Sequence, residues 1–174
     1  MNLSDSKRKL IFAIIMVSTV MSSMLSTALT TALPSIMEDL EITASTGQWL
    51  TSIYSLVMGI SLLCTAYLAG RFPTKKLYIT ALGIFITGLV IDFVSVNFIS
   101  MLIGRILQAT GNGILLAVAQ MILLTIYPPE KRGSVMGICG LATAGAPVFA
   151  PTLAGIIIDY LGGWRMIFAL IAVV

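Results

Sequence analysis

Five long runs of apolar residues constrain this chain more than any other feature of its sequence. They lie near residues 10–33, 47–70, 77–96, 99–126 and 134–160. Each is at least as long as the roughly 20 residues that a helix needs to cross a bilayer core. A sixth run covers residues 165–174, which would form about 15 Å of helix, half of such a core. We therefore expect an all-α integral membrane protein with five full transmembrane helices and an incomplete sixth.

The composition excludes several classes of protein. Hydrophobic residues make up 58% of the chain and charged residues 10%, whereas soluble domains are about one quarter charged. The chain has no histidine, and both cysteines, Cys64 and Cys139, lie inside apolar runs, so we expect neither a metal site nor a disulfide framework. No nucleophile with a base and no pair of deep carboxylates is evident, so we do not expect an enzyme.

The basic residues indicate how the chain lies in the membrane. Eight of the ten Lys and Arg residues fall in three places on one side of the predicted helices: Lys7, Arg8 and Lys9 in an N-terminal tail (1–9), Arg71, Lys75 and Lys76 in a second connection, and Lys131 and Arg132 in a third. By the positive-inside rule this side is the cytoplasm. Because the net charge of +3 is explained by topology, it does not indicate a nucleic-acid partner. Residues 10–174 are expected to form one membrane bundle.

Arg105 is the least expected residue in these apolar runs. A guanidinium at the centre of a membrane helix costs about 2.5–3.5 kcal/mol on insertion scales, so it should face the protein interior or a water-filled cavity. Helical spacing places Gln108 and Asn112 on the same face as Arg105. Asp92 lies deep in the third run, where it could contact a proton or substrate or snorkel toward the outer interface.

The first apolar run is rich in hydroxyl side chains. Ser26, Thr27 and Thr30 could line a cavity or form hydrogen bonds with carbonyl groups of their own helix. Pro34 is expected to end this helix.

The fifth apolar run carries small residues and prolines at four-residue spacing. Pro147, Pro151 and Gly155 lie on one track, and Ala146, Ala150 and Ala154 lie on the adjacent one. We expect a bent helix whose small residues form a packing seam or a hinge.

A transporter accounts for these features better than a channel, because the chain has no repeated pore-lining helix and no filter loop. The order of its motifs also resembles a known family. The matching pieces are TALTTALPSIM, TGQWLTSIYSLVMGI, RFPTKKL, GRILQATGNGI, PPEKRGSVMGI and APVFAPTLAGIIIDYLGGWRMIF. Together they are similar to the fourteen-helix drug:proton antiporter branch of the major facilitator superfamily, particularly its lincomycin-efflux-like group.

The resemblance implies a function and several roles. It implies export of lipophilic drug-like substrates across a bacterial cytoplasmic membrane by alternating access, driven by a proton gradient without a cofactor. Arg105, Gln108 and Gly111 match the motif whose arginine is linked to proton coupling. Pro147, Pro151 and Gly155 match the family's antiporter motif.

The resemblance also implies partners and an alternative. This chain would be one bundle, in contact with lipids, that needs a missing C-terminal bundle or a partner chain. The loop AGRFPTKK lacks the aspartate usual in the superfamily, which puts an acid-based latch in doubt. The alternative is a non-transporting membrane fragment or interaction subunit.

Overall fold

The structure, a computed structural model, is built entirely of helices in the residues it describes, 5–160 and 163–173. The helices are α1 (Asp5–Asp39), α2 (Ala44–Arg71), α3 (Thr74–Phe93), α4 (Phe98–Ile126), α5 (Pro129–Tyr160) and α6 (Arg165–Val173). In this part of the chain, α1 to α5 are each long and apolar enough to cross a membrane. The predicted all-α fold with five full spans is therefore confirmed. Residues 1–4 of the predicted tail and residue 174 of the sixth run lie outside the described residues.

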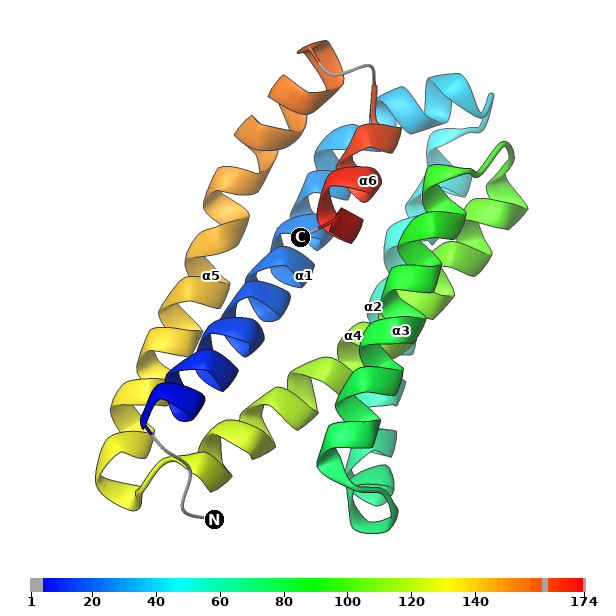
Figure 1. Ribbon diagram of the computed structural model, residues 1–174. Coiled ribbons are helices and arrows are strands. Elements are labelled where there is room, and N and C mark those ends of the chain that lie inside the picture. The colour runs from blue at the N-terminus through cyan, green and yellow to red at the C-terminus, as the bar shows by residue number, and fades with distance from the viewer. Residues whose placement is uncertain (1–4, 161–162, 174) are drawn as a thin grey trace.

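The helices form two groups, which Figure 1 shows side by side. Helices α1 and α5 run along each other, and α2 and α3 pack on α4. Helix α4 crosses obliquely and ends at the base of α5, while the short α6 packs mainly against α3. A large apolar cluster joins these helices, and a smaller one around Ile15, Ala119, Leu123 and Val135 joins α1, α4 and α5 at one end.

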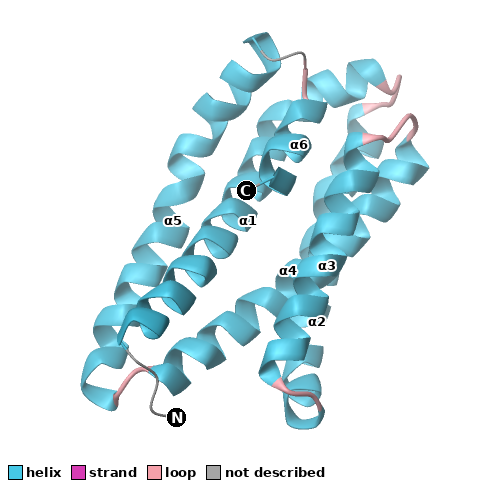
Figure 2. Cartoon of the chain, viewed as in Figure 1, coloured by secondary structure: helices cyan, strands magenta, loops and turns pink. Residues whose placement is uncertain are grey.

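Short connections with local caps join the helices (Figure 2). The side chain of Thr43 accepts a hydrogen bond from the backbone N–H of Thr46 at 3.3 Å and caps α2. Asn97 caps α4 in the same way, accepting from the N–H of Ser100 at 2.8 Å. Helix α5 begins with Pro129, whose missing N–H costs nothing in a first turn. These caps satisfy backbone groups that helix ends leave unpaired.

The expectation that Pro34 ends the first helix is wrong, because α1 continues through it to Asp39. Proline removes one hydrogen bond, here the bond to the carbonyl of Thr30. Both residues lie near the end of the helix, where Thr30 and Pro34 are exposed. A backbone group freed at such a place does not have to be satisfied by packed protein, so the helix can tolerate the proline.

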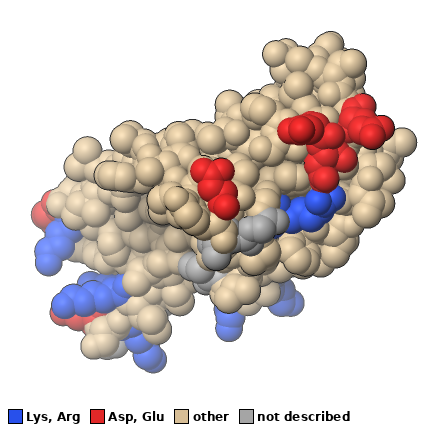
Figure 3. Space-filling view, turned by 90° about the horizontal axis from the view of Figure 1, so that it is seen from above, with Lys and Arg blue, Asp and Glu red and all other residues tan. Residues whose placement is uncertain are grey.

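Most basic residues lie at one end of the molecule. The start of α1 and the α2–α3 and α4–α5 connections lie at one end, so the eight predicted cations share that end (Figure 1). Seen from above, Figure 3 shows a group of acidic side chains with basic side chains beside it, and further charged side chains of both signs at the left. The shared end of the eight cations agrees with the charge pattern that the sequence predicts.

Glycines on α4 allow its neighbours to approach closely. A Cβ atom added to Gly113 would lie 2.6 Å from the carbonyl oxygen of Met58 in α2. One added to Gly111 would lie 2.7 Å from backbone atoms of Ala81 and Phe85 in α3. The backbones of α2, α3 and α4 therefore touch, as small residues allow in membrane proteins.

Candidate functional site

The guanidinium of Arg105 lies inside the protein and not in a lipid-facing position. The residue is 1% exposed. Its Nη1 donates a hydrogen bond of 2.7 Å to Oε1 of Gln108, one turn further along α4. The sequence predicted either a protein interior or a water-filled cavity, and the structure has the interior.

Gln108 connects Arg105 to an acid on another helix. Its Nε2 donates to Oδ2 of Asp92 in α3 at 2.7 Å. Asp92 is fully buried, so it does not snorkel to the outer interface. One amide group therefore joins a buried guanidinium to a buried carboxyl group, through one hydrogen bond to each.

Tyr54 of α2 completes the cluster, although it was not among the residues predicted from the sequence. The guanidinium carbon of Arg105 lies 4.1 Å from the centre of the Tyr54 ring. The Tyr54 hydroxyl accepts a hydrogen bond of 2.7 Å from Nδ2 of Asn112. A tyrosine well inside a span, away from the interfaces where tyrosine is enriched, was the available signal. Arg105 thus rests on an aromatic face, an arrangement that stabilises desolvated cations.

Two polar atoms of this cluster have no hydrogen-bond partner. They are Nε of Arg105 and Oδ1 of Asp92, and both are buried. A Cβ atom added to Gly104 would lie only 2.0 Å from Oδ1, so this oxygen rests against the glycine backbone. Buried polar atoms nearly always have a hydrogen-bond partner, and an exception can mark a functional group. We call Asp92, Arg105, Gln108, Asn112 and Tyr54 the buried polar cluster.

Substitutions at Tyr54 separate its ring from its hydroxyl. Tyr54→Leu removes the aromatic face under Arg105 and should lower the free energy of unfolding by about 2 kcal/mol. Tyr54→Phe keeps the ring and removes only the bond with Asn112, which should cost about 1 kcal/mol. Unfolding in mixed detergent micelles measures both values. Equal losses in the two variants would contradict a role for the ring.

The antiporter-motif residues of α5 lie beside its contact with α1. Ala146, Ala150 and Ala154 are buried, whereas Pro147, Pro151 and Gly155 are partly buried. A Cβ atom added to Gly155 would meet nothing within 4 Å. The alanine track, and not the glycine, therefore forms the packing seam between α5 and its neighbours.

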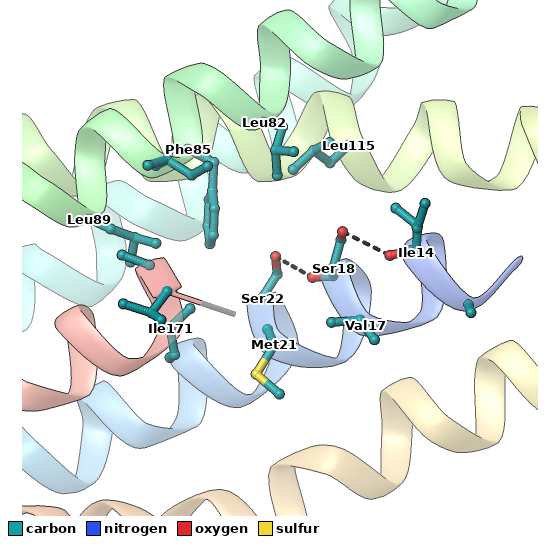
Figure 4. Close-up of a pocket in the computed structure, with 14 residues that line it drawn as sticks. Ile14, Val17, Ser18, Met21, Ser22, Leu82, Phe85, Leu89, Leu115 and Ile171 are labelled. Atoms are coloured by element: carbon teal, nitrogen blue, oxygen red, sulfur yellow. Dashed lines mark hydrogen bonds between the residues drawn. The ribbon is translucent and has the colours of Figure 1, made fainter. Parts of the chain in front are cut away.

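The predicted hydroxyls of α1 were expected to line a cavity or to bond back to their own helix, and the structure has one bond of the second kind. Ser26 and Thr30 are exposed, Thr27 is partly buried, and Thr30 donates to the carbonyl of Ser26 at 3.3 Å. A cavity of about 470 Å³ lies nearer the start of α1, between α1, α3 and the end of α6. Figure 4 shows Ser18 and Ser22 at its wall among apolar side chains. Ser18 and Ser22 therefore line this cavity, and the lining of a transport cavity by Ser26, Thr27 and Thr30 stays a prediction.

The basic side chains of the predicted cytoplasmic loop are exposed at the surface. Arg71, Lys75 and Lys76 are exposed, and the guanidinium of Arg71 lies 5.0 Å from the centre of the Tyr67 ring.

Among residues 5–160 and 163–173, no three side chains that could bind a metal ion lie together.

A second charged group ties helix ends together opposite the basic loops. Nη1 of Arg165 lies 2.7 Å from Oδ2 of Asp39, and its Nη2 donates to the carbonyl of Ser95 at 3.0 Å. Nε1 of Trp164 also donates to Asp39, at 3.3 Å. Trp164 is 4% exposed, so it is a packed residue and not the interfacial anchor typical of membrane tryptophans.

Comparison with known sequences finds one family over nearly the whole chain. The model of the Major Facilitator Superfamily matches residues 15–174. The uncharacterised MFS-type transporter YcnB of Bacillus subtilis is 40% identical over 164 residues, 94% of this chain and 34% of YcnB. The lincomycin resistance protein LmrB of Bacillus subtilis is 39% identical over 76% of this chain and 28% of LmrB. The chain thus spans about a third of the length of these relatives.

Solved structures share its fold. A bacterial homologue of the human lysosomal transporter Spinster, in an inward-facing and unoccupied conformation, covers 98% of this chain with a TM-score of 0.83 and 18% identity. The chain covers 41% of that structure. A peptide transporter, POT, in complex with sulfate gives a TM-score of 0.82 at 17% identity, and the chain covers 35% of it.

Proposed function

Since the chain belongs to the major facilitator superfamily, we propose that it is the N-terminal part of a longer transporter that exports lipophilic drugs in exchange for protons. The transporter works by alternating access, with the proton gradient as its energy source and no cofactor. The lincomycin resistance protein LmrB supports drug export. The multidrug export protein EmrB of Haemophilus influenzae, which is 30% identical over 75% of this chain, supports it as well.

The observation that carries the proposal is the link from Arg105 through Gln108 to Asp92. Of the acidic residues in the described part of the chain, Asp92 is the one that is buried inside a span. When its carboxyl is ionised, its charge and that of Arg105 cancel. When the carboxyl binds a proton, the buried polar cluster carries a net charge of +1. Such a change in a poorly solvated site can shift the balance between two conformations.

The unpaired atoms of the cluster support Asp92 as the group that binds the proton. Oδ1 of Asp92 has no hydrogen-bond partner, so this oxygen is available to accept a proton. Gln108 donates to the other oxygen, Oδ2, and this bond is stronger when the acid is ionised. Protonation of Asp92 therefore weakens its link through Gln108 to Arg105.

The orientation follows from the charge pattern. The end of the molecule that carries the eight cations faces the cytoplasm of a bacterial cell (Figure 1), so the N-terminus lies on the inner side of the membrane. Asp92, near the other end of α3, is then close to the outer side, from which protons enter a bacterial cell.

Transport by the full-length protein in proteoliposomes tests the proposal. A pH gradient should drive the fluorescent lipophilic dye ethidium against its concentration gradient. Asp92→Asn should remove at least about nine tenths of this driven transport but keep exchange of ethidium for ethidium, because the substrate path is intact and only the proton site is lost. Asp159→Asn is a matched control, since Asp159 is exposed at the end of α5.

Two results would contradict the proposal. The first is absence of gradient-driven transport of ethidium and of lincomycin by the unmodified protein. The second is full gradient-driven transport by Asp92→Asn, which would remove Asp92 from proton coupling while leaving export in place.

A further inference from the structure

The carbonyl group of Thr143 in α5 lacks its usual hydrogen-bond partner within the helix. The usual donor is the backbone N–H four residues later, and that residue is Pro147, which has no N–H. A hydroxyl from another helix takes its place, because Oγ of Ser23 in α1 donates to this carbonyl at 2.8 Å. Membrane helices tolerate proline when a neighbouring side chain satisfies the freed backbone group.

This hydrogen bond differs from the others that the hydroxyls of α1 make. Those of Ser18, Thr19, Ser22 and Thr30 donate to carbonyl groups three or four residues earlier in α1 itself. In the described part of the chain, Ser23 is the hydroxyl of α1 that donates to a different helix. The hydroxyl of Thr143 does not satisfy its own carbonyl either, since it donates to the carbonyl of Cys139 at 2.8 Å.

The bond lies where α1 and α5 run along each other. Ser23 and Thr143 are both partly buried there, and the adjacent Ser22 of α1 and Ala146 of α5 are buried. Thr143 also lines a cavity of about 320 Å³ together with residues of α1 and α4. The Ser23 hydroxyl is therefore the side-chain donor that the structure places on this carbonyl.

We propose that Ser23 is a positioning residue whose hydroxyl holds the Pro147 region of α5 against α1. Because the bond connects the two helices at the freed carbonyl, α1 and the part of α5 around Thr143 move as one unit. The other unit is α2, α3 and α4, whose backbones touch at the glycines of α4. The role of Ser23 depends on the chemistry of Pro147 and not on the export of drugs or the binding of protons.

A double-mutant cycle on the intact protein in detergent micelles tests this role. Ser23→Ala should speed deuterium exchange of the α5 amides around residues 143–150 about threefold, the size of an average interhelical hydrogen bond in a membrane protein. Ser23→Thr keeps a hydroxyl and should restore the slow rate. Ser55→Ala is the control, because the Ser55 hydroxyl bonds only within its own helix.

The decisive comparison uses the variant Pro147→Ala, because alanine has a backbone N–H that can donate to the Thr143 carbonyl. In this background Ser23→Ala should have no further effect on exchange, because the carbonyl no longer needs the serine. Equal effects of Ser23→Ala with and without proline would overturn the inference. If Pro147→Ala does not fold, equal exchange in Ser23→Ala and Ser23→Thr would overturn it instead.

Discussion

Replacing Arg105 by leucine is expected to lower the free energy of unfolding by about 3 kcal/mol. The substitution leaves Asp92 as a buried acid without its cation, and removing one partner of a buried ion pair costs about 3–5 kcal/mol. We expect the lower end because Gln108 separates the two charges. Unfolding in mixed micelles, followed by circular dichroism at neutral pH, measures the change.

Two further variants decide whether the loss comes from the unpaired acid. Arg71→Leu removes an exposed cation from an aromatic ring and should cost less than about 1 kcal/mol. Adding Asp92→Asn to Arg105→Leu should restore more than half of the lost stability, since the double variant buries no charge. If Arg105→Leu is no worse than Arg71→Leu, or if the double variant is no better than the single one, the charges are not coupled.

The apolar runs were sufficient to predict the class of fold, because each bilayer span needs its own length of apolar helix. They could not predict helix ends. Helix α1 begins at Asp5 and continues to Asp39, beyond the apolar run, because polar residues extend a helix without cost once it leaves the hydrocarbon. Pro34 was misread for the same reason: near an end, a lost backbone bond has solvent as a substitute.

The sequence predicted that Arg105, Gln108 and Asn112 share one face of α4, and the three lie in one cluster. Arg105 and Gln108 are bonded to each other, as one-turn spacing allows, and Asn112 bonds to Tyr54 of α2, whose ring lies under Arg105. Contacts within a helix follow from sequence spacing. The bond from Gln108 to Asp92 depends on how α3 is rotated against α4. That rotation is determined by glycines whose contacts appear only after the helices have packed.

Gly111 is one of those glycines, and Gly111→Ala is expected to destabilise the protein by about 2–3 kcal/mol, as overpacking does in well-filled interiors. The new Cβ would lie 2.7 Å from the carbonyl oxygen of Ala81 and 2.7 Å from the backbone nitrogen of Phe85. Neither is the end of a flexible side chain, so α3 and α4 have to separate.

The control is Gly83→Ala, which places the same methyl group in helix α3 with nothing within 4 Å. Alanine is the better helix former, so Gly83→Ala should leave stability unchanged or raise it by up to about 1 kcal/mol. Because Gln108 lies one turn before Gly111, separation of the helices also stretches its bond to Asp92. Gly111→Ala should therefore reduce the additional cost of Arg105→Leu, whereas strict additivity of the two losses would show that packing and charge pairing are independent.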